Sequence, residues 1–242
     1  MIMKRLSLFL LSTLLVLAAF AAERTVHIKG LISGISVSSG IEVLYVPGEA
    51  PGYVLVSGPA DEIPLVDVKV NKSTLVIGAV EQRVWSKLLN RSGVKHVKVT
   101  VYAPAVGDIS VSSGAEIKVR NPLELGGRNV KLSASSGGDI ELDGGMVCGN
   151  CNANASSSGD IEVKGFEAKN LSMNASSGAD IEFKAINVRT VKANVSSGAN
   201  ITVKGRADRA DMNASSGGDI KIRELVCGMV RENRSSGGKI KR

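Results

Sequence analysis

Residues 176–184 read Ser-Ser-Gly-Ala-Asp-Ile-Glu-Phe-Lys, and residues 196–204 repeat the phrase as Ser-Ser-Gly-Ala-Asn-Ile-Thr-Val-Lys. Related phrases recur through the second half of the chain, and a polar anchor follows each Ser-Ser pair at a fixed offset. The intervals between successive anchors are 23, 21, 20, 20, 19 and 20 residues. Such a period is typical of a solenoid, in which each repeat buries its apolar face by stacking on the next. The anchors are Glu116, Asp139, Asp160, Asp180, Asn200, Asp219 and Lys239.

Each repeat contains two segments in which polar and apolar residues alternate, one before the Ser-Ser-Gly phrase (such as 191–195) and one after it (such as 180–184). Alternation with a period of two is typical of half-buried strands, which here turn Val195 and Ile201 inward. The phrase between them predicts a tight turn, because glycine reaches positive φ at no steric cost. Each coil is therefore expected to be strand, tight turn, strand and a looser return. Since parallel crossovers are almost always right-handed, the sequence predicts an all-β, right-handed parallel β-helix with about 20 residues per coil.

Residues 1–22 resemble a secretory signal peptide. Lys4 and Arg5 precede an apolar run over 6–20, and a small-x-small cleavage site ends at Ala21. The run of about 15 residues is short for a membrane span, which needs about 20. No cysteine follows the cleavage site, so a bacterial lipid anchor is not expected. We expect an exported protein, located in the periplasm, on the outer membrane surface or outside the cell.

The mature chain divides into two parts. Residues 23–107 form a less regular N-terminal β part, and residues 108–242 form the regular repeats. The last repeat is polar, since Arg234 replaces an inward alanine and a lysine replaces the acidic anchor, as a cap against aggregation requires. The irregular excursion 81–93 carries the one tryptophan, Trp85. We interpret Trp85 as packing against the core or its end, with an exposed interaction anchor as the alternative.

The three cysteines fall in an oxidising compartment if the chain is exported. A local disulfide between Cys148 and Cys151 is predicted, as a structural bridge across a Cys-Gly-Asn-Cys loop. Cys227 lies four coils further on, about 19 Å away at the usual strand spacing, whereas a disulfide needs Cα atoms within about 7 Å. No helix pattern follows the pair, which argues against a thioredoxin-type motif. Zinc would need more ligands, and His27 and His96 are distant in sequence.

Stacking also aligns charges in columns along the axis. Like charges in adjacent strands are destabilising, and calcium bound by carboxylates would relieve the repulsion. A basic column two residues beyond the glutamates offers neutralisation without a metal. We therefore expect solvated acids, with no metal and no cofactor. The acidic ladder is Asp139, Asp160, Asp180 and Asp219, the second column is Glu141, Glu162 and Glu182, and the basic column is Lys164, Lys184, Lys204 and Arg223.

One further column consists of asparagines, whose amides can hydrogen-bond along the axis when coils stack. These positions also read as Asn-x-Ser glycosylation acceptors, but their recurrence at one place in the repeat is explained by the ladder. The column is Asn154, Asn174, Asn194, Asn213 and Asn233, with Ser133 at its head.

The order of Ile-Ser-Val-Ser-Ser-Gly-Ile-Glu-Val-Leu-Tyr at 35–45, Val-Lys-Val-Thr-Val-Tyr-Ala-Pro at 97–104 and the repeated Ser-Gly-(Gly/Ala)-Asp-Ile coils resembles the putative auto-transporter adhesin head domain, or GIN domain. The similarity covers nearly the whole mature chain. It implies a right-handed parallel β-helix at the cell envelope, an adhesive role, and no catalytic residues. Many members of that family carry a lipid anchor, from which this chain departs by lacking the cysteine.

Composition narrows the function classes. The net charge of +7 falls to +5 without Lys4 and Arg5, and basic residues are interspersed with acids rather than clustered, so nucleic acid is not expected as a partner. Residues 108–242 hold only two aromatic side chains, Phe166 and Phe183. A glycan cleft needs aromatic platforms and clustered carboxylates, which disfavours the alternative of a β-helix lyase or hydrolase. We expect a non-catalytic adhesin or structural interaction module that contacts an unidentified envelope polysaccharide or protein. A calcium-stabilised glycan-binding module is a second alternative, and homo-oligomerisation stays open.

Overall fold

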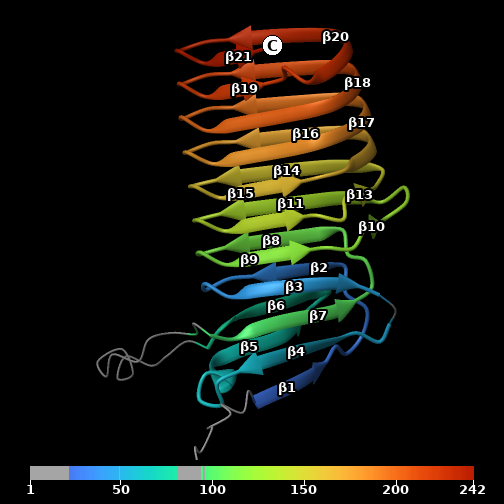
Figure 1. The fold of residues 1–242 in the computed structure, drawn as a ribbon, viewed down its shortest axis with the longest axis vertical. Coiled ribbons are helices and arrows are strands. Elements are labelled where there is room, and N and C mark those ends of the chain that lie inside the picture. Colours follow the sequence, from blue (N-terminus) through green and yellow to red (C-terminus); the bar gives the residue numbers. More distant parts are fainter. Residues whose placement is uncertain (1–21, 49, 81–93, 95) are drawn as a thin grey trace, which may run out of the picture.

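The computed structural model describes residues 22–48, 50–80, 94 and 96–242. Within these ranges the chain consists of strands and turns, with one short 3-10 turn, η1 (Ile63–Leu65), and no α-helix. The strands stack into an elongated rod whose C-terminus lies at one end (Figure 1). The predicted signal peptide, apart from its last residue, and Trp85 lie outside the described residues. The N-terminal strands are β1 (Ala22–His27), β2 (Gly34–Val37), β3 (Glu42–Pro47), β4 (Tyr53–Gly58), β5 (Val66–Asn71), β6 (Thr74–Ala79) and β7 (Lys98–Ala103).

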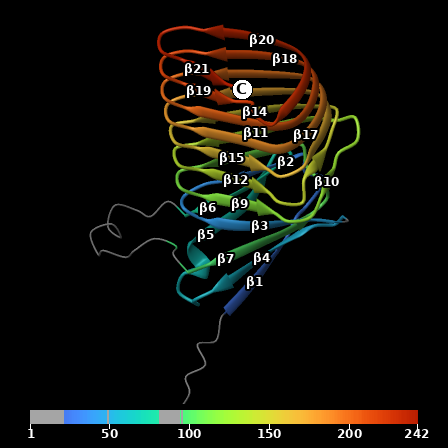
Figure 2. The ribbon, with the colours of Figure 1, turned by 45° about the horizontal axis from the view of Figure 1, so that its top comes forward.

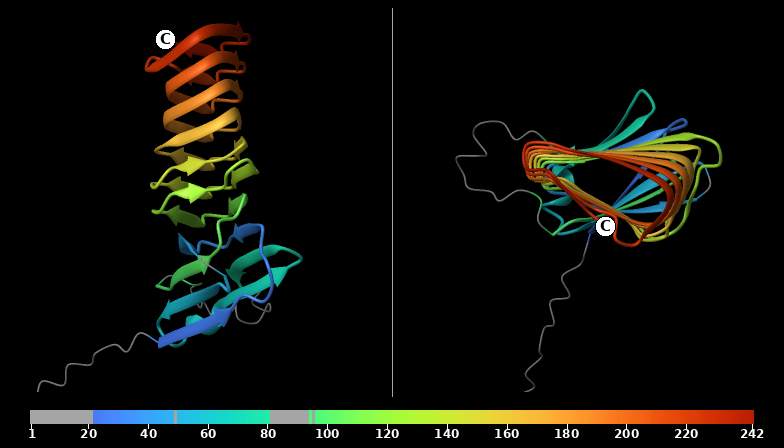
Figure 3. Two further views of the ribbon diagram at one scale, coloured as in Figure 1. Left: turned by 90° about the vertical axis from the view of Figure 1, so that its right-hand side faces the viewer. Right: turned by 90° about the horizontal axis from the view of Figure 1, so that it is seen from above.

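The regular part begins at β8 and runs to the C-terminus. Its chain path is right-handed, rising coil by coil around one axis (Figures 1 and 3). Its strands are β8 (Asp108–Ser112), β9 (Glu116–Val119), β10 (Leu123–Glu124), β11 (Asn129–Ser135), β12 (Asp139–Leu142), β13 (Met146–Val147), β14 (Asn150–Ser156), β15 (Asp160–Val163), β16 (Phe166–Ala175), β17 (Asp180–Val195), β18 (Asn200–Ala214), β19 (Asp219–Lys221), β20 (Leu225–Arg234) and β21 (Lys239–Lys241).

Parallel pairing between coils builds the walls of the rod. On the wall before the tight turns, β8, β11, β14, β16, β17, β18 and β20 pair in that order. On the wall after the turns, the order is β9, β12, β15, β17, β18, β19 and β21. Asp160 lies opposite Asp180, and Asp180 opposite Asn200, so one coil takes 20 residues here. This confirms the predicted parallel β-helix and its period.

The return segment is more ordered than the sequence suggested. A third parallel ladder joins β10 to β13, β13 to β16 and β16 to the second half of β17. Its residues Leu123, Met146, Phe166 and Ile186 are all buried. The prediction of a looser return was wrong in this respect. These large side chains form another inward column, which keeps the backbone extended and paired.

The Ser-Ser-Gly phrases form the predicted tight turns. The backbone φ is +54° at Ser177 and +70° at Gly178, so two consecutive residues lie in the left-handed region that two-residue hairpin-like turns require. Ser158 occupies the glycine place of its own turn at φ +58°. The amide of Gly178 donates to the carbonyl of Ser197 on the next coil at 3.2 Å. The turns therefore stack by hydrogen bonds as the strands do.

One apolar core runs through the rod. Ile181, Phe183 and Ile201 have at most 1% of their surface exposed, and Val195 is 3% exposed, as the alternation predicts. Phe183 meets Phe166 edge to face, with ring centroids 5.0 Å apart. Burial of this continuous column is the dominant stabilising contribution, at about 25 cal/mol per Å² of apolar surface.

The N-terminal part does not follow chain order along the axis. Strands β2 and β3 add one parallel coil next to the regular part, pairing with β8 and β9 on one side and with β6 and β7 on the other. Strand β4 runs antiparallel between β1 and β7, and β5 runs antiparallel to β6. Among the described strands, β1 and β5 thus have one partner each, and β1 lies at this end of the rod (Figure 2).

Charged residues cover the opposite end of the core. The register places Arg234 beside Ala214 and Glu232 beside Met212, as the repeat alignment predicts for Arg234. The Glu232 carboxylate contacts Arg234 and lies 2.6 Å from Nε of Arg242. Charges at inward positions therefore pair with each other above the last buried coil.

Candidate binding surface

The predicted asparagine column forms a hydrogen-bonded ladder on the wall before the turns. Nδ2 of Asn174 donates to Oδ1 of Asn154 at 3.0 Å, Asn194 donates to Asn174 at 2.9 Å, and Asn213 donates to Asn194 at 3.0 Å. Asn233 lies opposite Asn213. The ladder confirms that these asparagines share one place in the coil.

A second asparagine ladder lies on the same wall, and sequence reasoning missed it. Asn150 donates to Asn129 and Asn170 donates to Asn150, each at 2.7 Å. Thr190 continues this row opposite Asn170. The sequence does contain the signal for this ladder, because Asn129, Asn150 and Asn170 each lie four residues before a member of the first column. Aligning only the residues nearest the turn left them out.

Together these rows make a surface of amides and hydroxyls that we call the amide face. In the coils of β14 and β16 its outward residues carry no formal charge, whereas Lys192 and Asp211 bring charge in the coils of β17 and β18. The face is defined by Asn129, Asn150, Asn152, Asn154, Ser156, Asn170, Ser172, Asn174, Ser176, Thr190, Lys192, Asn194, Ser196, Asp211 and Asn213.

Two shallow hollows mark the amide face. One, of about 550 Å³, is lined mainly by the column from Asn154 to Asn213 and the serines that follow it. The other, of about 490 Å³, is lined by the column from Asn129 to Asn170 with Thr190 and Lys192. Volumes of this size fall within the range of small-ligand sites, but the lining of each hollow comes from four successive coils. The surface therefore suits an extended chain molecule better than a compact ligand that needs an enclosed pocket.

The ladder leaves hydrogen-bonding capacity directed outward. An asparagine side chain has two N–H donors and two acceptor lone pairs on its oxygen. In the column, Asn174 uses one donor towards Asn154 and one acceptor towards Asn194. One donor and one acceptor remain for solvent or a ligand at each coil, and successive coils repeat them about every 4.8 Å.

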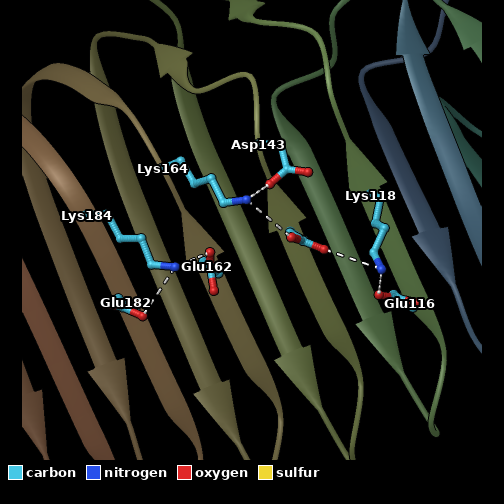
Figure 4. A network of polar contacts seen from close by, with 8 residues as sticks. Glu116, Lys118, Asp143, Glu162, Lys164, Glu182 and Lys184 are labelled. Atoms are coloured by element: carbon cyan, nitrogen blue, oxygen red, sulfur yellow. Dashed lines mark hydrogen bonds and ion pairs between the residues drawn. The ribbon is translucent and has the colours of Figure 1, made fainter.

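The wall after the turns is charged instead (Figure 4). Nζ of Lys118 lies 2.7 Å from Glu116 in its own coil and 3.4 Å from Glu141 in the next. Hydrogen bonding to Glu116 is the main cause that raises the pKa of Lys118. Nζ of Lys184 likewise lies 2.5 Å from Glu162 of the preceding coil and 3.8 Å from Glu182 of its own. Lysines thus bridge successive coils and neutralise the glutamate column.

The acidic ladder lies in register, but the basic column does not pair with it as expected. Lys164 contacts Asp143 and lies 3.7 Å from Glu141, and Lys204 lies 3.0 Å from Glu224. The expected balance by lysines therefore applies to the glutamates rather than to Asp139 or Asp160. The physical reason is reach, because Lys164 extends back to carboxylates of the preceding coil and Lys204 extends forward to Glu224 of the next.

The aspartates of the ladder meet each other or other partners. Asp139 lies opposite Asp160, and Asp180 accepts a hydrogen bond of 2.7 Å from Nδ2 of Asn200. Asp219 contacts Lys241. Burial, followed by the charges of Glu116 and Asp160, raises the pKa of Asp139 to about 6. Among the described residues, no group of three or more His, Cys, Asp and Glu side chains is arranged to hold a metal ion.

The predicted Cys148–Cys151 disulfide is absent from the structure, in which both residues are buried free thiols. Cys151 was expected in a loop but lies in strand β14. It faces the core from β14, between Val130 on β11 and Leu171 on β16. Burial raises the pKa of Cys148 to about 11 and that of Cys151 well above its usual range, which disfavours thiolate chemistry. Cys227 is partly exposed, and its Sγ–H contacts the carbonyl of Met229 at 3.2 Å.

Comparison with known proteins gives both a family and a fold. The family model described as "Putative auto-transporter adhesin, head GIN domain" matches residues 33–203 and 152–241. A search of curated proteins returned no significant match. No helix in the described part of the chain is long and apolar enough to cross a membrane.

Three solved structures share the fold. A putative adhesin from Bacteroides fragilis is 18% identical with a TM-score of 0.79, covering 91% of this chain and 96% of its own. A putative adhesin from Parabacteroides distasonis is 17% identical with a TM-score of 0.73, covering 93% and 97%. A putative adhesin from Parabacteroides merdae is 16% identical with a TM-score of 0.68, covering 91% and 95%.

Proposed function

The chain belongs to the family of the putative auto-transporter adhesin head GIN domain, and on this premise we propose that it is a non-catalytic binding module of the cell envelope whose amide face holds a neutral, hydroxyl-rich polysaccharide. The protein would be exported, to the periplasm, the outer membrane surface or the exterior. The observation that carries this proposal is the pair of asparagine ladders on one wall of the rod.

The chemistry of the face favours a neutral glycan over a charged one. Over residues 150–156 of β14 and 170–175 of β16 the outward side chains are asparagine and serine, which donate and accept hydrogen bonds without a net charge. Sugar hydroxyls have the same dual character. A chain lying along the axis would meet a fresh donor and acceptor at each coil. Because no aromatic platform stacks on the sugars, each unit would bind weakly, and affinity would grow with the number of units engaged.

The charged wall supports a non-catalytic reading. General acid–base hydrolysis of glycosides needs two carboxyl groups that flank a bound sugar and differ in protonation. The glutamates Glu141, Glu162 and Glu182 instead recur with the repeat and lie near Lys118, Lys164 and Lys184. Their geometry is that of a neutralised surface rather than of a paired acid and base.

Binding to immobilised neutral polysaccharides, compared with acidic ones, tests the proposal. Replacing Asn174 and Asn194 together by alanine should weaken binding to the neutral polymer at least tenfold. The reason is that the outward N–H donor and the outward oxygen acceptor of each asparagine are lost. The matched control replaces Thr202 and Lys221 by alanine, two outward residues on adjacent coils of the charged wall. Equal loss in both variants, or wild-type binding confined to acidic polymers, would reject the amide face as the binding surface.

A further inference from the structure

A pocket of about 390 Å³ opens at the N-terminal end of the rod, between the end of β1 and the hairpin of β5 and β6. It exists because β1 and β5 do not pair with each other. Across the gap, the guanidinium of Arg24 on β1 donates to the carbonyl of Val66 on β5 at 2.6 Å. This side-chain hydrogen bond joins the two strands where no backbone ladder forms. Nε of Arg24 is buried and has no partner of its own. This site lies on strands that contribute nothing to the amide face.

The walls of the pocket are apolar. Val26 on β1 faces Val68 and Val70 on β5, and all three are only partly buried. Ile28 and Leu75 are buried, and both belong to the core of the rod. The pocket is thus a continuation of the core that no strand covers among the described residues. Contact between these aliphatic side chains and an apolar ligand is favourable, because it removes apolar surface from water.

The rim of the pocket is basic. His27, Lys29, Lys69 and Lys72 line it, and no acidic side chain does. Lys69 is paired with Asp67, whose carboxylate lies 2.7 Å from its Nζ. Lys29 and Lys72 are exposed and have no ion pair within the described chain. An apolar wall beneath unpaired cations is complementary to a ligand with an alkyl chain and one negative charge.

We propose that this pocket binds a single-chain anionic amphiphile of the fatty-acid class. The alkyl chain lies against Val26, Val68 and Val70, and the carboxylate is held between the ammonium groups of Lys29 and Lys72. The inference goes beyond the proposed polysaccharide binding, because it concerns other residues and another chemistry.

Decanoate, at concentrations well below its micelle range, is the probe for this site. Two further probes separate its features: butyrate carries the charge without the chain, and decyltrimethylammonium carries the chain with the opposite charge. Calorimetry should show one decanoate bound per protein, with both other probes at least tenfold weaker. Methyl and amide NMR shifts should change first at Val26, Val68 and Val70.

Two variants test the two halves of the site. Lys29→Gln with Lys72→Asn removes both charges, and asparagine tolerates the φ of +55° at position 72. This double variant should weaken decanoate about tenfold and should leave decyltrimethylammonium unchanged or tighter. Val68→Thr keeps the shape but adds a hydroxyl to the wall, and it should weaken decanoate as well. Lys131→Gln with Lys169→Gln, two exposed lysines of the regular part, is the matched control and should change nothing.

The outcomes decide the proposal in either direction. Equal affinity for decanoate and decyltrimethylammonium, no effect of the Lys29/Lys72 variant, NMR changes centred elsewhere, or no binding by the wild type would each overturn it. The wild-type comparison of the three probes stands on its own even if a variant folds poorly. Loss of polysaccharide binding with intact decanoate binding would reject the proposed function and retain this inference.

Discussion

Asp139 on β12 and Asp160 on β15 lie directly opposite each other on neighbouring coils. Glu116 flanks Asp139 from the other side, so three acidic residues succeed one another along the axis. Burial is the largest cause that raises the pKa of Asp139 from 3.8 to about 6, and the charges of Glu116 and Asp160 add to it. This short stretch of the acidic ladder is under electrostatic strain at neutral pH.

Asp139→Asn should therefore stabilise the protein at neutral pH. Because the folded pKa lies above the unfolded one, Asp139 favours folding while protonated, below about pH 4, and loses that contribution as the pH rises through about 6. The free energy of unfolding of the variant should exceed that of wild type by about 1–2 kcal/mol at pH 7, after allowance for partial exposure, and by little at pH 4. Urea unfolding at the two pH values measures this. A gap that is constant with pH would contradict the assignment.

Replacing Asp160 and Asp180 together by asparagine should change stability by less than about 1 kcal/mol at pH 7. The direction should be upward, since burial and then Asp180 raise the pKa of Asp160. Calcium should not raise the melting temperature of wild type, nor should a chelator lower it. A calcium-dependent rise that disappears in the double variant would establish a metal site on this ladder.

Asn174→Ala should cost about 1–2 kcal/mol of unfolding free energy, because Asn174 both donates to Asn154 and accepts from Asn194. Asn213→Ala removes one ladder hydrogen bond, to Asn194, and should cost about half as much. Chemical denaturation of both variants gives the comparison. Equal losses would show that the ladder bonds do not contribute individually.

Ile201→Asp should unfold the regular part of the rod, because Ile201 is fully buried and an unpaired carboxylate there costs at least about 3 kcal/mol. Val195→Asp should behave in the same way. The neighbouring Thr202→Asp places the same carboxylate outside and should melt near wild type. Circular dichroism follows the loss of strand signal, and unchanged melting of the Ile201 variant would mean that the inward register is wrong.

Thiol titration under non-reducing conditions should detect one reactive cysteine in the native protein and three after unfolding. Cys227 is partly exposed, whereas Cys148 and Cys151 are buried and their thiols have raised pKa values. A count of one in both states would instead indicate that Cys148 and Cys151 are joined.

The repeat by itself determined the fold of this protein. A period near 20 residues and strict alternation, as in Ile181 and Phe183, allow one stable outcome, in which each coil buries its apolar side chains only by stacking on the next. The same period placed the asparagines and the aspartates in axial columns, because residues one repeat apart are neighbours in a parallel stack.

Only the tertiary structure decided which side chains contact each other between columns and which strands pair at the N-terminal end of the rod. The reach of Lys184 back to Glu162, the inward place of Cys151 and the third ladder through Phe166 depend on how each coil closes on itself. The placement of β2 and β3 beside β8 and β9 depends on pairings between segments far apart in the chain. A periodic pattern specifies the contacts it repeats along one axis. The period does not specify contacts across a coil or contacts of strands that do not repeat. These contacts depend on how segments far apart in the chain pack together in the folded protein.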